Sequence, residues 1–106
     1  LMKLSLYTFV RNGLFQDFHV EAMLRHHVPY VDEIIVNEGF SDDGTFEAIS
    51  SIDSKVHVHR FEWDRSDPNG WHRKFKNQAR ELCTGDWCLL LDCDEFMPEW
   101  EFERLR

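Results

Sequence analysis

The sequence predicts an α/β fold in which a parallel sheet is covered by helices. Stretches typical of strands alternate with segments whose apolar residues recur at helical spacing, in the order β-α-β-α-β-α-β-α. Turn-forming residues separate these stretches. The chain has 106 residues, 42% of them apolar, which suits one domain with one modest core.

The first half of the chain supplies two strands and two helices. Residues 3–10 are rich in apolar, aromatic and β-branched types and predict the first strand, and residues 31–37 predict the second. Between them a helix is expected from Gln16 to His27, ending before a proline. Three residues are expected on one side of it: Phe15, Phe18 and Ala22. A second helix is expected in residues 46–52, where three apolar residues recur at helical spacing: Phe46, Ile49 and Ile52.

The second half repeats the pattern. Residues 55–63 alternate and predict the third strand, with His57 and His59 on one side of it. Residues 71–83 predict a helix with one apolar stripe: Trp71, Phe75, Ala79 and Leu82. Residues 87–91 form an uninterrupted apolar run, which predicts a strand covered on both faces. The closing residues 99–106 are charged and helix-prone.

The charge balance limits the classes of partner. Asp and Glu number 20 against 12 Lys and Arg, giving a formal net charge of -8. A long polyanion would be repelled, so the composition argues against nucleic acid as a partner. A small phosphorylated ligand bridged by a divalent cation remains compatible with this charge, because acidic side chains can bind the metal and the metal can bind the phosphate.

The remaining composition predicts a soluble, cytoplasmic domain. The three cysteines, Cys83, Cys88 and Cys93, are expected to be small core residues in a reducing compartment. No apolar run approaches the ~20 residues of a membrane helix, and no basic-then-apolar leader is present. We expect residues 1–106 to be a single domain taken from a larger protein, since the chain opens on Leu1 and its last helix has no stop signal.

In open parallel sheets ligands bind outside the carboxyl ends of the strands. Polar residues follow three of the predicted strands, at 8–12, 37–43 and 92–95. Asp92 and Asp94 are two residues apart, so in an extended segment both carboxylates would point the same way. Such a pair suits Mg²⁺ or Mn²⁺ with open positions for phosphate oxygens, although acids also end strands simply because turns favour them.

Three stretches taken together resemble family 2 glycosyltransferases: VNEGFSDDGT at 36–45, KNQARELCTGDW at 76–87 and LLLDCDE at 89–95. The resemblance spans essentially the whole chain and implies the nucleotide-sugar-binding half of a GT-A fold, a Rossmann-like parallel sheet with flanking helices. It also implies a transferase that moves a sugar from a nucleoside diphosphate, with a UDP-sugar favoured, to a saccharide or other acceptor hydroxyl. Most of this family inverts at the anomeric carbon.

Site residues follow from the same resemblance. Asp92 and Asp94 match the family's Asp-x-Asp, which implies that both coordinate Mn²⁺ or Mg²⁺ and that Asp92 also lies near the ribose. Glu38 falls on the nucleotide-contacting acid after the second strand. The other implied nucleotide-sugar contacts are Thr8, Arg11, and Arg73 or Lys74.

The chain also departs from the family pattern. It has Asn37-Glu38 where two aspartates are usual, and one extra residue before Asp42-Asp43, which leaves the choice of nucleotide open. The family's general base lies on a later segment, so we expect it beyond Arg106.

Other interpretations remain beside this one. The stretch LLLDCDEF is superficially similar to haloacid-dehalogenase-like phosphatases, in which Asp92 would be the nucleophile. A non-catalytic nucleotide-binding module is the other alternative. Asp42 and Asp43 can cap a helix or bind metal. Trp63 can stack on a sugar, whereas Trp71 and Trp87 fit the core. The six histidines lack zinc-site spacing. Open sheet edges make a homo-oligomer plausible.

Overall fold

The structure, a computed structural model, describes residues 2–14, 19–63, 66 and 71–105. Its four strands form one all-parallel sheet in the order β3-β2-β1-β4. The strands are β1 (Leu4–Val10), β2 (Glu33–Glu38), β3 (Val56–Arg60) and β4 (Trp87–Leu90). The predicted α/β, Rossmann-like class is therefore confirmed, and all four carboxyl ends meet at one edge of the sheet.

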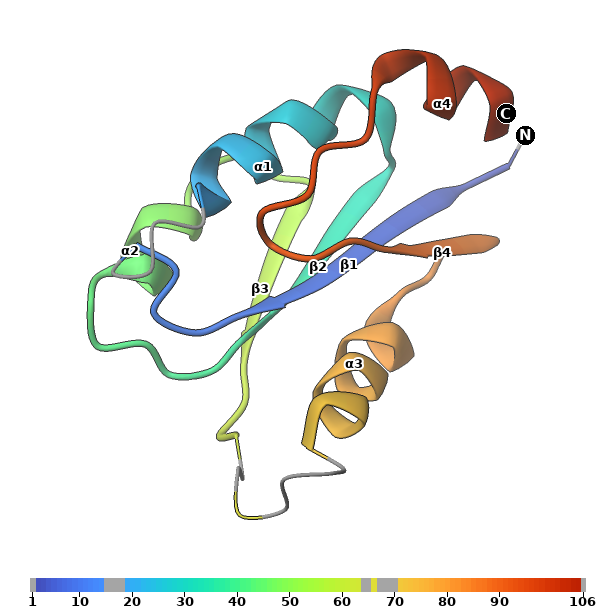
Figure 1. Ribbon diagram of the computed structural model, residues 1–106. Helices are drawn as coiled ribbons and strands as arrows, with labels where there is room; N and C mark the ends of the chain where they lie inside the picture. The colour runs from blue at the N-terminus through green and yellow to red at the C-terminus, as the bar shows by residue number, and fades with distance from the viewer. Residues whose placement is uncertain (1, 15–18, 64–65, 67–70, 106) are drawn as a thin grey trace.

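Helices cover both faces of the sheet (Figure 1). They are α1 (Val20–His27), the 3-10 helix η1 (Val28–Tyr30), α2 (Thr45–Ile49), α3 (Trp71–Leu82) and α4 (Glu99–Leu105). In Figure 1, α1, α2 and α4 lie on one side of the sheet and α3 lies on the other. The element order is the predicted one with η1 added. Among the described helices, none is long and apolar enough to cross a membrane.

The alternation of side chains along β1 divides the core into two parts. Leu4, Leu6 and Val10 belong to the larger cluster, which includes Met23 and Leu24 of α1. Tyr7 faces the other way and packs with Ile35 of β2 and Ala79 of α3. Because each face of the sheet is covered by helices, β1 and β2 are buried along almost their whole length.

The buried face of α1 differs from the predicted one. Ala22 is exposed, and the helix packs on the sheet through four other residues: Val20, Met23, Leu24 and His27. These positions repeat at three- and four-residue spacing, which is the helical period. The predicted start at Gln16 and the residues Phe15 and Phe18 lie outside the described residues.

The strand β4 is less buried than predicted, because it is not covered on both faces. β4 is an edge strand of the described sheet, and Trp87 is 61% exposed rather than in the core. Of the three cysteines, Cys93 is buried, Cys83 is partly buried and Cys88 is exposed. An uninterrupted apolar run reports hydrophobicity, but it does not report how many neighbours the strand has.

A polar network fixes β4 beside β1 at the amino end of the sheet. Oε2 of Glu33 accepts hydrogen bonds from Ser5 Oγ at 2.5 Å and from the Thr84 amide at 2.6 Å. The Gly85 amide donates to Ser5 Oγ at 2.8 Å, and a Cβ on Gly85 would lie 2.5 Å from that oxygen. Burial raises the pKa of Glu33, but the hydrogen bonds from Ser5 and Thr84 outweigh it and hold the pKa below its ordinary value.

Candidate functional site at the carboxyl edge of the sheet

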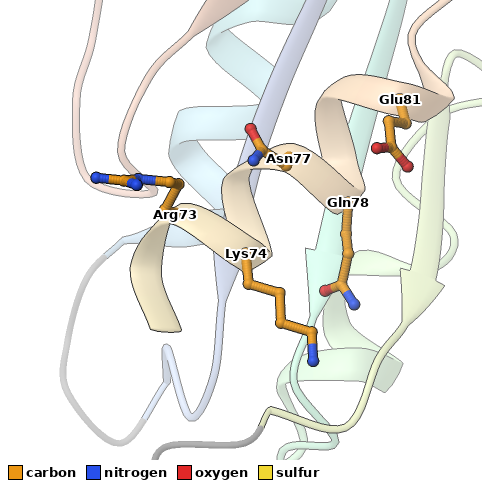
Figure 2. Close-up of a pocket in the computed structure, with 5 residues that line it drawn as sticks. All are labelled: Arg73, Lys74, Asn77, Gln78 and Glu81. Carbon is orange, nitrogen blue, oxygen red and sulfur yellow. The ribbon is translucent and has the colours of Figure 1, made fainter. Parts of the chain in front are cut away.

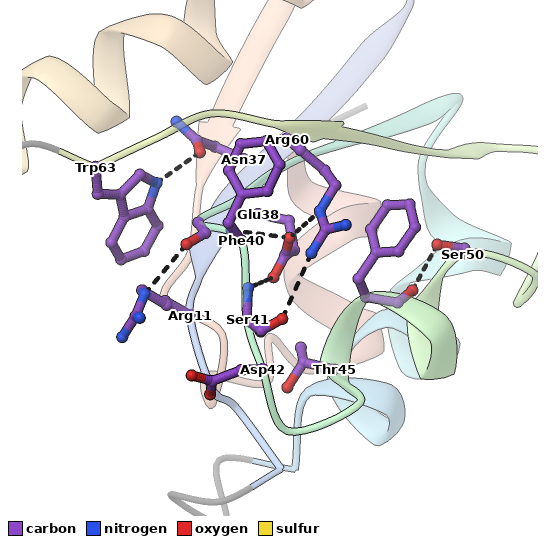
Figure 3. Close-up of polar contacts among 12 residues, drawn as sticks. Arg11, Asn37, Glu38, Phe40, Ser41, Asp42, Thr45, Ser50, Arg60 and Trp63 are labelled. Carbon is purple, nitrogen blue, oxygen red and sulfur yellow. Dashed lines mark hydrogen bonds and ion pairs between the residues drawn. The ribbon is translucent and has the colours of Figure 1, made fainter.

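A buried carboxylate organises the loop after β2 (Figure 3). Glu38 is the last residue of β2 and has no exposed surface. Its Oε1 accepts from Arg60 Nε at 2.8 Å and from the Phe40 amide at 3.0 Å, and its Oε2 accepts from the Ser41 amide at 2.7 Å. The ion pair and the two amides together compensate for burial of the charge. Glu38 therefore fixes the β2–α2 loop, and its contact with a nucleotide stays a prediction.

Arg60 is the partner that sequence reasoning missed. It is the last residue of β3, and its guanidinium lies 4.6 Å from the ring centre of Phe40 and 4.1 Å from that of Phe46. This placement between two rings adds cation–π attraction to the ion pair with Glu38. The available signal was a basic residue at the end of a strand adjacent to the one that ends in Glu38. Recognising it required the strand order.

The loop after β1 is joined to the loop after β2. Arg11 Nε donates to the Gly39 carbonyl at 3.1 Å, and the Asn12 amide donates to Ser41 Oγ at 2.7 Å. Asn12 Oδ1 in turn accepts from the Asp42 amide at 3.0 Å. The rest of the Arg11 guanidinium points away from the Glu38 cluster (Figure 3). The structure thus brings the ends of β1 and β2 together. The guanidinium of Arg11 is directed outward from them (Figure 3).

The side chain of Asn37 ties β2 to α3 and to the segment after β3. Its Nδ2 donates to the Phe75 carbonyl and to Gln78 Oε1, each at 3.1 Å, and its Oδ1 accepts from Trp63 Nε1 at 2.9 Å. Trp63 stacks on the ring of Phe75 with centroids 4.4 Å apart. A Cβ on Gly39 would lie 2.6 Å from Cε2 of Trp63, so this approach requires glycine. Trp63, the sequence's candidate for sugar stacking, thus packs against Phe75 of α3 and bonds to Asn37 of β2.

The two acids before α2 have different surroundings. Asp43 Oδ1 accepts hydrogen bonds from the Thr45 amide at 3.0 Å and from Thr45 Oγ1 at 2.5 Å, at the first residue of α2. This contact supports the capping interpretation for Asp43. Asp42 is exposed at the same edge of the sheet.

Thr8 lies inside the sheet rather than at its edge. It is fully buried in β1, two residues before the strand ends at Val10. Its Oγ1 is buried without a hydrogen-bond partner in the described part of the chain. An unpaired buried hydroxyl carries a free-energy cost. The side chain of Thr8 is thus covered by protein, and its contact with a nucleotide stays a prediction.

The acidic tip after β4 forms a turn instead of an extended segment. The Glu95 amide donates to the Asp92 carbonyl at 3.0 Å, and Glu95 Oε1 accepts from the Asp92 amide at 2.7 Å. Asp92 and Asp94 are both exposed, and Cys93 between them is buried. The predicted extended geometry was wrong because Glu95 folds the segment back on itself, yet both carboxylates still face solvent.

The acids at this turn suit a hard cation. Among the described residues, no group of three or more His, Cys, Asp or Glu side chains is arranged to hold a metal ion. Mg²⁺ commonly takes one or two carboxylates and completes its shell with water and phosphate oxygens. Asp92 and Asp94 offer two exposed carboxylates of this kind, and their coordination of a cation stays a prediction.

The basic residues of α3 lie beside a shallow groove of about 350 Å³ (Figure 2). Five side chains line it: Arg73, Lys74, Asn77, Gln78 and Glu81. Arg73 extends from one side of the helix, and Lys74 and Gln78 extend from the other (Figure 2). Gln78 bonds to Asn37, so Lys74 shares the side of α3 that faces β2. Both basic side chains are exposed, and their contact with a nucleotide sugar stays a prediction.

Two histidines of α1 hold the segment that follows the acidic turn. His27 is fully buried, and its Nδ1 donates to the Met23 carbonyl at 2.7 Å. Its Nε2 accepts from the Met97 amide at 3.0 Å, so the ring is neutral. His26 Nε2 donates to the Met97 carbonyl at 2.8 Å. Both backbone groups of Met97, three residues after Asp94, are therefore fixed by α1.

Protonation of His27 is expected to destabilise the fold. Burial lowers the pKa of His27, the hydrogen bond to Met23 opposes this effect, and His26 lowers the pKa further, with a net depression. An unfolded histidine titrates near about 6.5. The stabilisation is therefore complete above that pH and is lost as pH falls from it through the depressed pKa of the folded chain.

We expect the melting temperature of the unsubstituted chain to fall more steeply below about pH 6.5 than that of His27→Gln, which cannot gain this charge. Thermal unfolding followed by circular dichroism at successive pH values measures the difference. His57→Gln, at an exposed position, serves as the control and should follow the unsubstituted chain. Parallel pH profiles for the unsubstituted chain and His27→Gln would contradict the assignment.

Comparison with known proteins agrees with this architecture. No protein-family model matches the chain, and no curated protein matches it. Among solved structures, the crystal structure of TarS from S. aureus matches with a TM-score of 0.73 and 20% sequence identity, covering 98% of this chain and 31% of the TarS chain. TarS is a glycosyltransferase, and this chain shares the fold of the part of TarS that it matches. The chain spans less than a third of the length of the protein it matches.

Proposed function

We propose that this chain is the donor-binding part of a glycosyltransferase of the GT-A type, related to family 2. In this proposal it binds a nucleoside diphosphate sugar through Mn²⁺ or Mg²⁺, and the whole enzyme transfers the sugar to a saccharide or other acceptor hydroxyl. The observation that carries the proposal is the exposed Asp92-x-Asp94 turn at the carboxyl edge of a TarS-like sheet. Ligands of open parallel sheets bind at that edge.

Asp92 and Asp94 are the proposed cation ligands, and Asp92 is proposed to lie also near the ribose. Carboxylate oxygens are the hard ligands that Mg²⁺ and Mn²⁺ prefer. A cation held there supplies positive charge that stabilises the leaving diphosphate. The turn closed by Glu95 keeps the two carboxylates on the solvent side, whereas Cys93 anchors the turn in the core.

The joined loops after β1 and β2 are proposed to form the nucleotide pocket. Arg11 presents a cation that can pair with phosphate oxygens or bond to a base. Glu38 contributes by holding the main chain of Phe40 and Ser41 in place. Thr8 supports the end of β1 from inside. One of Arg73 and Lys74, on α3, is proposed to reach the diphosphate or the base. A UDP-sugar remains the favoured donor.

The acceptor step needs groups that we do not assign within this chain. Direct displacement with inversion requires a base that takes the proton from the acceptor hydroxyl. We propose that this base belongs to a part of the enzyme outside residues 1–106. The chain alone is expected to bind the donor nucleotide without transferring sugar.

Metal-dependent nucleotide binding tests the proposal. We expect calorimetric titration of this chain to show binding of UDP with Mn²⁺ and none with EDTA, and weaker binding of GDP. Loss of partners that merely orient a metal ligand costs roughly 10- to 100-fold in affinity, so Asp92→Asn and Asp94→Asn should each weaken UDP binding at least about tenfold.

Glu103→Gln, which removes an exposed acid from α4, is the matched control and should bind UDP as the unsubstituted chain does. Equal UDP binding with Mn²⁺ and with EDTA would instead favour a metal-independent nucleotide-binding module. Unchanged affinity in both aspartate variants would remove the metal assignment.

A further inference from the structure

Phe40 is an exposed aromatic residue at the carboxyl edge of the sheet, in the loop between β2 and α2. It is 49% exposed, although the two residues before it, Glu38 and Gly39, are buried. Its backbone φ is 56°, in the left-handed region that a bulky residue rarely adopts. Strain of this kind persists only where the surrounding structure imposes it, and it is typical of functional sites.

Hydrogen bonds to the backbone of residues 39–41 impose this conformation. The Gly39 carbonyl accepts from Arg11 Nε at 3.1 Å. The Phe40 amide donates to Glu38 Oε1 at 3.0 Å, and the Ser41 amide donates to Glu38 Oε2 at 2.7 Å. None of these bonds uses the side chain of residue 40, so they would form equally well with glycine there, which adopts a positive φ without strain. The presence of phenylalanine therefore points to a use for its ring.

The ring of Phe40 is held against a fixed cation. The guanidinium of Arg60 lies 4.6 Å from the centre of this ring and 4.1 Å from the centre of the Phe46 ring, so it lies against both (Figure 3). Arg60 is held in turn by its ion pair with Glu38, at 2.8 Å. Because Arg60 covers one face of the Phe40 ring, the exposed half of the side chain presents the other face to solvent. Phe40 is thus a flat apolar surface that is fixed in place before any ligand binds.

We propose that Phe40 is the surface on which the base of the nucleotide donor stacks. This inference rests on the proposed function and names the residue of that site that binds the base. Every nucleobase has a flat π face, and stacking on an aromatic side chain tolerates different bases. Phe40 therefore contributes affinity for the nucleoside rather than the choice among bases. Glu38, which fixes both the Phe40 amide and Arg60, is then a positioning residue for the base.

Stacking at Phe40 and cation binding at Asp92 and Asp94 act on different parts of the donor. The two carboxylates follow β4 and Phe40 follows β2, and these strands lie on opposite sides of β1 in the sheet. The proposed cation binds the diphosphate, whereas the ring stacks on the base. Pyrophosphate, which has the two phosphates and no base, therefore reports the cation site alone.

Calorimetric titration of this chain with UDP and with inorganic pyrophosphate, each with Mn²⁺, tests the inference. Phe40→Gly removes the ring and suits the backbone conformation. We expect it to weaken UDP binding roughly five- to 150-fold, the range that stacking of one base on an aromatic side chain supplies, and to leave pyrophosphate binding unchanged. Phe40→Tyr keeps a ring and should bind UDP as the unsubstituted chain does. Trp100→Ala, which removes an exposed aromatic side chain from α4, is the matched control and should also leave UDP binding unchanged.

Urea unfolding separates an effect on binding from an effect on stability. Phe40→Gly loses the contact with Arg60 but relieves the left-handed strain, so its urea midpoint should stay close to that of the unsubstituted chain. A midpoint lowered as far as in Glu38→Ala would assign the ring to stabilising Arg60 and would overturn the inference.

The titrations also separate this inference from the proposed function. Unchanged UDP affinity in Phe40→Gly, or an equal loss of affinity for UDP and for pyrophosphate, would overturn the stacking role, whereas Mn²⁺-dependent binding of UDP to the unsubstituted chain would still support the proposed function. If the unsubstituted chain bound neither UDP nor pyrophosphate with Mn²⁺, the proposed function itself would be contradicted, and the stacking role with it.

Discussion

Replacement of Glu38 by alanine is expected to lower the free energy of unfolding by about 3 kcal/mol, since removing one partner of a buried ion pair costs roughly 3–5 kcal/mol. The lower end of that range applies because Arg60 keeps 30% of its side chain exposed. The substitution also leaves the amides of Phe40 and Ser41 without their acceptor. Urea unfolding followed by circular dichroism measures the change.

Two further variants separate the contributions at this position. Glu38→Gln keeps an acceptor oxygen and removes the charge, so its loss should be smaller than that of Glu38→Ala. Glu47→Ala removes an exposed carboxylate from α2 and should change stability by no more than about 0.5 kcal/mol. If Glu38→Ala were as mild as Glu47→Ala, the role of Glu38 in fixing the β2–α2 loop would be wrong.

Replacement of Phe75 by alanine is expected to cost about 3–5 kcal/mol, the usual range for a fully buried phenylalanine. Phe75 has no exposed surface and stacks on Trp63, and its carbonyl accepts from Asn37. The substitution opens a cavity between α3 and the sheet and removes the surface on which Trp63 rests. Chemical unfolding again gives the magnitude.

Phe75→Leu should cost less, because much of the buried volume is kept. Lys74→Ala, at an exposed neighbouring position of α3, should stay within about 0.5 kcal/mol of the unsubstituted chain. Similar losses for Phe75→Ala and Lys74→Ala would show that α3 does not pack on the sheet through Phe75.

Local patterns were sufficient to predict the fold class. Apolar runs and helical periodicity belong to each segment by itself, so the strand–helix order followed from them. The buried face of α1 was missed because Ala22 was chosen from a short apolar pattern, whereas the helix packs on the sheet through Val20, Met23, Leu24 and His27. The exposure of Trp87 was missed because an apolar run contains no information about strand order.

For the candidate site, the sequence could indicate only features formed by residues that are close together along the chain. Asp92 and Asp94 were singled out from the apolar run that precedes them and from the resemblance to a family, and their role as cation ligands stays a prediction. The ion pair of Glu38 with Arg60 joins residues from two strands, so it depends on β2 and β3 being neighbours. The turn at Asp92 is closed by a hydrogen bond to the side chain of Glu95. Because glutamate occurs in many backbone conformations, its presence in the sequence did not predict this turn.

The central claim is that the Asp92-x-Asp94 turn holds the cation of a bound nucleotide. Paramagnetic Mn²⁺ broadens nuclear magnetic resonance signals close to it, so amide spectra of this chain with UDP and Mn²⁺, compared with UDP and Mg²⁺, locate the cation directly. We expect the strongest broadening at residues 91–96 and 10–12, and we expect Asp92→Asn to abolish it. Broadening centred on the acidic residues of α4, at 99–103, or unchanged broadening in Asp92→Asn, would contradict it.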